Sequence, residues 1–373
     1  MTILGTRPEI IRLSAVIELL DRSSQHILIH TGQNYDPRLN EIFFRDLGLR
    51  PPDVNLGVLG GSFGEQVGQL LHRVEEAILL HRPDRLLILG DTNSGLAALI
   101  ARRLGIPVYH MEAGNRCFDD RVPEEINRRV IDQCSSVLMP YTERSRENLL
   151  REGIASDRVY VTGNPIKQVL DRHAGRITRS TILPDLGLTA RRYFLATLHR
   201  AENVDVEARL HSLVRALDQL TEAFGIPVIC TLHPRTRAKM SQFQAAAKTA
   251  LVRFIEPLGL FDFVAMEQSA FCVLTDSGTV QEEACIFHTP VVTVRDVTER
   301  PETIECGSNV LSGCEPDMIV NCVEQMTATA RNWAAPPEYL ATNVAETVCA
   351  IVLGFRLPDR AEEQWQLAKR VRT

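Results

Sequence analysis

The sequence predicts an α/β protein of two domains, each built on a parallel β-sheet. The chain has 373 residues, more than one ordinary core accommodates, since single domains cluster at roughly 100 to 200 residues. Short apolar runs alternate with amphipathic stretches of roughly 10 to 20 residues, which is the rhythm of βαβ units. Polar clusters follow the apolar runs, at the strand ends where such sheets bind ligands.

The first domain is predicted to be Rossmann-like and to span residues 1–172. A short apolar strand opens the chain, and the later strands alternate with helices. The further strands are expected at residues 25–31, 85–89, 108–111, 137–139 and 159–162. The helices are expected at residues 10–21, 63–81, 94–104, 124–134 and 143–152.

A second Rossmann-like domain is expected at residues 173–355, because the pattern breaks near residues 172–191 into Arg, Thr, Gly and Pro. Its strands are expected at residues 193–197, 227–232, 250–254, 271–275 and 290–294. Residues 356–373 are expected to form a C-terminal helix that packs back on the N-terminal domain. Two such domains facing a central cleft provide a place for a ligand.

Composition favours a cytoplasmic protein with a small ligand. Hydrophobic residues at 45% and charged residues at 24% are close to globular averages. No apolar run approaches the roughly 18 residues of a membrane span, and no signal peptide is expected at the start. Nine scattered cysteines without CxxC spacing favour reduced thiols and no metal site. A net charge of −6 argues against nucleic acid but not against a diphosphate.

The motif GTRPE at residues 5–9 follows the first strand and opens a helix. Backbone N–H groups and the helix dipole at such a turn attract an anion, and Arg7 would add a cation. The alternative is an ordinary turn with a proline at the start of a helix. No GxGxxG motif is present, so a dinucleotide cofactor is unsupported.

Two further motifs follow predicted strands of the first domain, QNYD at residues 33–36 and GDT at residues 90–92. An acid such as Asp91 at the end of a buried strand is costly unless it is paired or functional. The alternative is that Asp91 is the N-cap of the next helix.

The densest polar cluster contains HMEAGNR at residues 110–116 and PEEINRR at residues 123–129. Five carboxylates and four arginines lie between Glu112 and Arg129, more than a solvated loop requires. The alternative is a structural ion-pair network. A pair such as Glu112 and Glu124 could divide acid and base roles if their environments separate their pKa values.

The second domain carries polar motifs after its own strands. His199 with Arg200 could hold a diphosphate, whereas His233 is more typical of a packed loop histidine. Glu283, about one turn into a predicted helix, could accept hydrogen bonds from two ribose hydroxyls. The motifs are LHRAEN at residues 198–203, DSGT at 276–279, QEEA at 281–284 and RDVTERPE at 295–302, the last with a further cation, Arg295.

These motifs, in this order over residues 5–302, resemble those of the non-hydrolysing UDP-N-acetylglucosamine 2-epimerases. The resemblance implies a type-B glycosyltransferase-like fold with UDP in the interdomain cleft, residues 173–355 forming the UDP-binding domain. It also implies a homodimer that needs no cofactor and no metal. The implied reaction eliminates UDP from a UDP-2-acetamido sugar to give a 2-acetamidoglucal, then adds UDP back with C2 inverted.

By motif, the resemblance implies three catalytic carboxylates, Asp91, Glu112 and Glu124, with His199 near the leaving diphosphate. The residues it implies for binding the UDP-sugar are Arg7, Arg12, Arg116, His233, Ser277, Gly278, Thr279, Glu283 and Arg300. The chain departs from the family in three places. Arg12 stands where many members have Lys, DSGT replaces DSGG, and Glu112 and Glu124 lie unusually close in sequence.

The substrate and two other functions stay open. The string MEAGNRCFDDRVPEEINR, with TGQNYD, resembles a subgroup that acts on modified sugars such as UDP-2,3-diacetamido-glucuronate and UDP-N-acetyl-6-deoxy-L-talosamine. UDP-N-acetylglucosamine is the reference substrate. The alternatives are a hydrolysing 2-epimerase, a type-B glycosyltransferase and a silent UDP-sugar sensor. The carboxylates argue against a transferase, because that reaction needs no group at C2.

Overall fold

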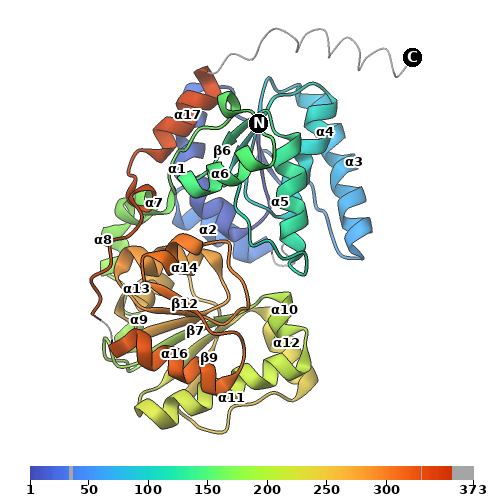
Figure 1. Cartoon of the computed structure of the whole chain (residues 1–373). Helices are drawn as coiled ribbons and strands as arrows, with labels where there is room; N and C mark the ends of the chain where they lie inside the picture. Colours follow the sequence, from blue (N-terminus) through green and yellow to red (C-terminus); the bar gives the residue numbers. More distant parts are fainter. Residues whose placement is uncertain (33–36, 329, 355–373) are drawn as a thin grey trace. The chain divides into compact units, whose positions relative to one another are not determined.

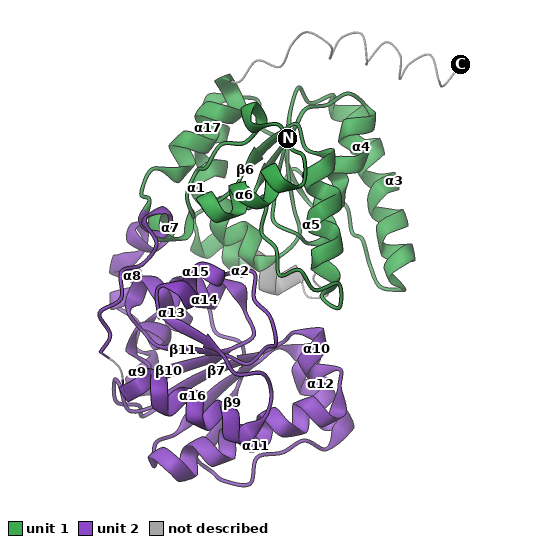
Figure 2. Ribbon diagram, in the orientation of Figure 1, with its two compact units in different colours: residues 1–169, 341–373 green, residues 170–340 purple. Residues whose placement is uncertain are grey.

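The computed structural model consists of two compact α/β units, and it describes residues 1–32, 37–328 and 330–354. Unit 1 contains Met1–Val169 and the chain from Ala341 onward, and unit 2 contains Leu170–Leu340 (Figure 2). Each unit has a six-stranded parallel sheet (Figure 1), so the predicted α/β class is confirmed. The QNYD motif and the predicted helix at residues 356–373 lie outside the described residues.

The sheet of unit 1 has the strand order β3-β2-β1-β4-β5-β6. Its strands are β1 (Thr2–Leu4), β2 (Leu28–His30), β3 (Val54–Asn55), β4 (Leu86–Leu89), β5 (Val108–Met111) and β6 (Val137–Met139). Its helices include α1 (Arg7–Ser23), α2 (Pro37–Asp46), α3 (Phe63–His81), α4 (Ala97–Arg103), α5 (Pro123–Cys134), α6 (Glu143–Arg151) and α17 (Val344–Gly354), with 3-10 turns η1 (Asn93–Leu96) and η2 (Ser156–Arg158). The order reverses between β1 and β4, which makes the ends of these strands a natural ligand site.

Local sequence explains why these elements form. All residues of β4 and β5 are buried, as expected for central strands covered by helices on both faces. Helix α3 begins with a capping box, in which Ser62 accepts from the Glu65 amide and Glu65 accepts from the Ser62 amide. It ends at Arg82 in the left-handed conformation.

The chain returns to unit 1 at residue 341, earlier than the expected boundary at 355. Helix α17 lies beside α1 (Figure 1), and the Cys349 thiol is 3.7 Å from the carbonyl oxygen of Val16. The Ala345 amide donates to the Gln168 side chain at 2.9 Å. The buried apolar face of α17 covers unit 1, which explains the earlier return. The first boundary falls inside α7 (Ile166–Arg172).

Unit 2 repeats the same topology, with the strand order β12-β11-β10-β7-β8-β9. Its strands are β7 (Phe194–Leu198), β8 (Val228–Leu232), β9 (Val252–Ile255), β10 (Cys272–Thr275), β11 (Val291–Thr293) and β12 (Asn309–Leu311). Its helices are α8 (Ala174–Thr178), α9 (Ile182–Asp185), α10 (Ala201–Val204), α11 (Glu207–Phe224), α12 (Pro234–Phe243), α13 (Leu260–Ser269), α14 (Gly278–Phe287), α15 (Pro301–Glu305) and α16 (Pro316–Ala328), followed by the turn η3 (Pro337–Leu340). Here the order reverses between β7 and β10.

The main errors of the strand prediction lie at sheet edges. The strand expected at residues 159–162 is wrong, because only Val159 forms a bridge to β6 before the chain turns at Gly163. The edge strands β3 and β12 were not predicted, since each is short and contains a polar residue. All nine cysteines are free thiols. Among the described residues, no helix combines the length and apolar character needed to cross a membrane.

Gly114, in the loop after β5, gives a test of how tightly α6 packs on that loop. Its φ is 78°, and an added Cβ would collide with the Ser145 carbonyl oxygen and lie 2.8 Å from Leu149 Cγ. We predict that Gly114→Ala lowers the free energy of unfolding by about 1 to 3 kcal/mol more than Gly153→Ala. Gly153 has a φ of 85° and no atom within 4 Å of the added carbon.

Urea denaturation of the two variants separates these effects, since both introduce alanine into left-handed backbone and only Gly114→Ala adds a collision. Equal losses of stability in the two variants would show that α6 shifts to accommodate the added carbon at position 114.

Candidate active site

The turn after β1 uses its own acid to satisfy its amides. The Glu9 carboxylate accepts from the amides of Gly5 and Thr6 at 3.0 and 2.7 Å and from the Thr6 hydroxyl at 2.7 Å. The Thr92 hydroxyl also donates to it at 3.2 Å. Burial outweighs the lowering effect of these hydrogen bonds and raises the pKa of Glu9 to about 7. The Gly5 and Thr6 amides are therefore occupied within the chain and are not available to an external anion, as in the alternative of an ordinary turn that opens a helix.

Arg7, predicted to bind substrate, is the first residue of α1. Its guanidinium carbon lies 5.0 Å from the centre of the Phe43 ring, and burial lowers its pKa. The side chain is half-buried, so it keeps access to solvent at the end of β1.

Asp91 follows β4 and is held by an arginine. Its carboxylate accepts from Arg128 Nε at 2.8 Å and lies 2.6 Å from Arg128 Nη2. Its carbonyl oxygen accepts from the Asn127 side chain at 3.0 Å. The interpretation of Asp91 as an N-cap is wrong, because the N-cap of the following turn is Thr92. Asp91 is thus an ion-paired carboxylate whose side chain keeps 21% of its exposure.

Glu112 lies directly after β5 in the left-handed conformation, with φ 64°. Arg12 donates to its Oε2 at 2.8 Å, the Tyr141 hydroxyl to the same atom at 3.4 Å, and Asn115 to its Oε1 at 3.3 Å. A Cβ on Gly90 would lie 3.6 Å from Oε2, so this carboxylate lies over the turn after β4. Strained backbone of this kind in a non-glycine residue is typical of functional sites.

Glu124 lies in the first turn of α5 and is half-buried. Its neighbour Glu125 is fully buried and accepts from the Cys117 amide at 3.0 Å and from Arg128 at 2.7 Å. Because Arg128 also binds Asp91, the helix that carries Glu124 is tied to the turn after β4. Burial alone would raise the pKa of Glu125, but the Cys117 amide and Arg128 lower it below its usual value.

Arg116 belongs to an interior network, so its assignment to substrate binding is wrong. Its side chain has no exposed surface, and it donates to Asp132 at 2.7 Å and to Glu152 at 2.6 and 2.8 Å. Asp132 also contacts His110 Nδ1 at 2.8 Å, and His110 Nε2 donates to the Gly90 carbonyl at 2.8 Å. This part of the dense cluster matches the alternative interpretation as a structural ion-pair network.

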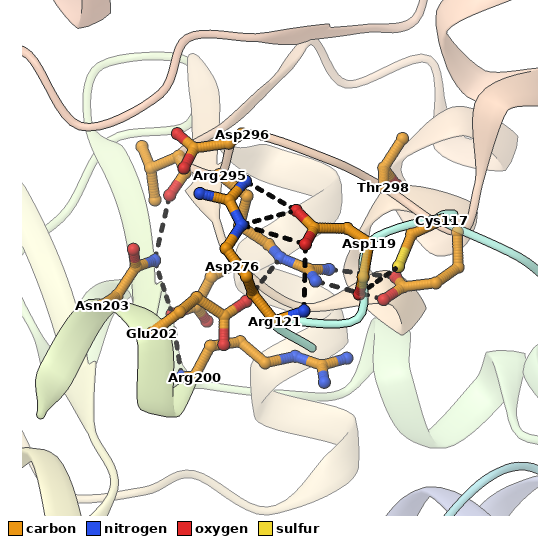
Figure 3. A network of polar contacts seen from close by, with 12 residues as sticks. Cys117, Asp119, Arg121, Arg200, Glu202, Asn203, Asp276, Arg295, Asp296 and Thr298 are labelled. Carbon is orange, nitrogen blue, oxygen red and sulfur yellow. Dashed lines mark hydrogen bonds and ion pairs between the residues drawn. The ribbon is translucent and has the colours of Figure 1, made fainter. Parts of the chain in front are cut away.

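In unit 2, Asp276 organises the ends of β7 and β10. This fully buried carboxylate lies 2.8 Å from His199 Nδ1 and accepts from the His199 amide. It also accepts from the Arg200 amide and from the side chain of Asn203, two neighbours labelled in Figure 3. Burial alone would raise the pKa of Asp276, but His199 and these donors hold it well below its usual range. His199 keeps 41% of its side-chain exposure, so its other ring edge reaches solvent.

The predicted UDP-binding residues Ser277, Gly278 and Thr279 form the start of α14. The Ser277 and Thr279 hydroxyl oxygens are 3.0 Å apart. A Cβ on Gly278 would lie 3.5 Å from the guanidinium carbon of Arg300, which donates to the buried carboxylate of Glu282. Arg300 therefore braces the helix start, where amides and dipole attract phosphate.

His233 is exposed, so its interpretation as a packed loop histidine is wrong. It is the N-cap of α12, and its Nδ1 accepts from the Arg235 amide at 3.3 Å. The proton on its ring is therefore on Nε2 in the neutral form, where it can donate.

Arg295, expected to offer a cation at the strand ends, is buried and structural. It donates to both oxygens of Glu299, at 3.0 and 3.1 Å. It also donates to Glu202 at 3.0 Å, and Arg295 and Glu202 are both labelled in Figure 3. A side chain that is 1% exposed and binds two carboxylates is held in the interior and does not face a ligand.

The sequence did not identify several residues that hold this site together. Arg128 and Asp276 lie in the quoted motifs and Tyr141 lies outside them, and the roles of all three depend on contacts between distant strands. Tyr141 follows β6, so only the strand order predicts that it meets Glu112. Among the described residues, no group of three His, Cys, Asp or Glu side chains is arranged to hold a metal ion.

Known proteins resemble this chain over most of its length. The family model described as UDP-N-acetylglucosamine 2-epimerase matches residues 18–353. The UDP-N-acetylglucosamine 2-epimerase of Methanocaldococcus jannaschii is 42% identical, over 90% of this chain and 93% of the relative. The UDP-2,3-diacetamido-2,3-dideoxy-D-glucuronate 2-epimerase of Pseudomonas aeruginosa is 41% identical, over 86% and 90%.

A solved structure agrees with the fold. The crystal structure of the M. jannaschii enzyme in complex with UDP-N-acetylglucosamine and UDP matches with a TM-score of 0.89 and 40% identity. The match covers 94% of this chain and 98% of that one.

The interior network around Asp132 predicts a large effect on stability. We expect Asp132→Asn to lower the free energy of unfolding by about 3 to 5 kcal/mol, because it removes a buried charged partner of the Arg116 guanidinium. The pKa of Asp132 is lowered in the folded state, so its contribution is complete at neutral pH and is lost as the pH falls below 3.8.

Urea denaturation at pH 7 and in acid measures both effects. Asp120→Asn is the control, since this carboxylate is 70% exposed and pairs with Arg129 at the surface. The control should change stability by about 0.5 kcal/mol or less. Equal effects of the two substitutions would contradict a structural role for the network.

Proposed function

The chain belongs to the UDP-N-acetylglucosamine 2-epimerase family and is an isomerase, and we propose that it inverts C2 of a UDP-linked 2-acetamido sugar without hydrolysis. The observation that supports this most strongly is the arrangement in unit 1. Carboxylates follow the adjacent strands β4 and β5, and a third lies on the helix tied to them by Arg128.

The proposed reaction proceeds by elimination and re-addition. The C1–O bond breaks and its electron pair leaves with UDP, while a carboxylate takes the proton from C2 and a C1=C2 double bond forms. The 2-acetamidoglucal then receives a proton at C2 on the opposite face, and UDP adds back at C1. This route suits a carbon that has no neighbouring carbonyl to acidify its proton.

Inversion needs proton transfer on two faces of the sugar, and therefore more than one acid or base. We assign these transfers to Asp91, Glu112 and Glu124. Glu112 has the most firmly held carboxylate of the three, because three side chains donate to its two oxygens. The residue is only 8% exposed. Preorganised groups of this kind lose little free energy to reorientation during the reaction.

Unit 2 is proposed to hold the UDP. His199 is oriented by Asp276 through Nδ1, and its Nε2 is proposed to contact the departing diphosphate. The start of α14, with Ser277 and Thr279, offers amides and hydroxyls to phosphate or uracil. Glu283 is proposed to accept from the ribose hydroxyls, and Arg300, Arg7, Arg12 and His233 complete the predicted set.

UDP-N-acetylglucosamine is the proposed reference substrate, and a modified sugar such as UDP-2,3-diacetamido-glucuronate is the second candidate. The chain is similarly identical to a relative named for each of these sugars, which supports both candidate substrates. Turnover of the two sugars by the purified protein decides between them through the ratio of kcat/KM.

The reaction is tested by proton NMR of the protein with UDP-N-acetylglucosamine in deuterated water. We expect deuterium at C2, a growing manno epimer and no lasting accumulation of UDP. Steady release of UDP and free sugar would instead establish a hydrolysing epimerase. Turnover to a glycosylated acceptor without exchange at C2 would establish a transferase.

The role of Glu112 is tested by Glu112→Gln. We predict at least about a hundredfold loss of C2 exchange, as expected for a general acid or base, with UDP binding unchanged by calorimetry. Glu143→Gln is the control, because this carboxylate is 61% exposed and pairs with Arg146 at the start of α6. Unchanged exchange in Glu112→Gln would remove this residue from the reaction.

A further inference from the structure

Two carboxyl groups lie together in the interior of unit 2. Glu267, in the last turn of α13, is fully buried, and Glu283 on α14 is 6% exposed. The two helices pack against each other, and the carboxyl groups are within hydrogen-bonding reach of one another. No salt bridge to Glu267 is found among the described residues, and none of its oxygens accepts from another side chain there.

The surroundings of this pair are apolar. The same two helices contribute Met266, Ala270, Val280 and Ala284 to one hydrophobic cluster. Two carboxylates cannot both be ionised at contact in such a place, so the pair retains a proton at neutral pH. Burial and the charge of Glu283 raise the pKa of Glu267 well above its usual value.

Helix position decides which group keeps the proton. Glu267 lies at the C-terminal end of α13, where the partial negative charge of the helix disfavours a carboxylate. Glu283 lies in the middle of α14, before its last turn, and is the less buried of the two. The neutral acid is therefore Glu267, and the charge is carried by Glu283.

We propose that Glu267 is a positioning residue that, as a neutral carboxylic acid, donates a hydrogen bond to Glu283 and fixes the orientation of that carboxylate for the ribose of UDP. Glu283 is then held from within the protein in the orientation that meets the ligand. This inference rests on the proposed role of Glu283 in binding UDP.

A merely structural role does not account for Glu267. A buried acid with no cation costs free energy, and an apolar residue of similar size would pack better among its neighbours. Residues that reduce stability in this way are expected where function requires them. Loss of Glu267 should therefore weaken UDP binding without weakening the fold.

The test compares Glu267→Met, which removes the donor, with Glu267→Gln, which keeps a neutral donor. We expect Glu267→Met to raise the Kd of UDP and the KM of the UDP-sugar about tenfold, the loss of roughly one hydrogen bond to a charged group. Its kcat should stay within about twofold and its Tm should equal or exceed that of the wild type. Glu267→Gln should restore most of the affinity.

Two further variants make the outcomes distinguishable. Asp218→Asn is the control for a buried structural carboxylate of unit 2, since Asp218 accepts from the amides of Lys248 and Thr249 at 3.0 and 3.2 Å. It should lower the Tm and leave the Kd of UDP unchanged. Glu283→Gln should weaken UDP binding at least as much as Glu267→Met does.

The results separate this inference from the function on which it rests. Wild-type affinity in Glu267→Met, with weak binding in Glu283→Gln, would overturn the role of Glu267 alone. Wild-type affinity in both variants would overturn the assignment of Glu283 to UDP as well. A lowered Tm together with a lower kcat and a higher KM would show a structural role and also overturn the proposal.

Discussion

Arg128 is the residue through which unit 1 holds its carboxylates in place. Its guanidinium binds Asp91 after β4 and Glu125 at the start of α5, so one cation joins a strand end to the helix that carries Glu124. A carboxylate taken out of water needs such a partner, because its desolvation otherwise costs several kcal/mol. Arg12 does the same for Glu112 at the end of the next strand. The positions of Asp91 and Glu112 thus follow from where a buried cation can meet each carboxylate.

The two units hold different polar groups at the ends of their central strands. Both sheets reverse their order at the centre, and the polar groups gather there in each. In unit 1 arginines hold carboxylates, whereas in unit 2 the buried carboxylate of Asp276 holds His199 and two backbone amides. The first arrangement presents carboxylates, and the second presents an imidazole and helix amides. That division matches a substrate with a proton to lose at the sugar and a diphosphate to bind.

Sequence patterns predicted the sheets and the location of the site better than they predicted the role of each charged side chain. The apolar runs identified the central strands because burial on both faces leaves a continuous signal, whereas the short edge strands β3 and β12 leave little. The motif around Glu112 marked the site, but Arg116 in the same motif is turned into the interior. Which way a side chain faces depends on the strands beside it, so spacing alone could not separate these two residues. Glu267 belonged to no motif, and only the packing of α13 on α14 connects it with Glu283.

The pairing of carboxylates with arginine also bears on the order of bond changes. An arginine beside a carboxylate stabilises its ionised form and makes it a weaker base. Asp91 and Glu112 are both paired in this way, which is a poor arrangement for taking a proton from an unactivated carbon. The same carboxylates are well suited to a C2 proton that becomes acidic as the C1–O bond breaks and positive charge develops at C1. Their negative charge would stabilise that charge while His199 assists the leaving diphosphate. In the proposed reaction, these ion pairs therefore favour departure of UDP ahead of proton removal, so that binding of the diphosphate would control the chemistry at C2.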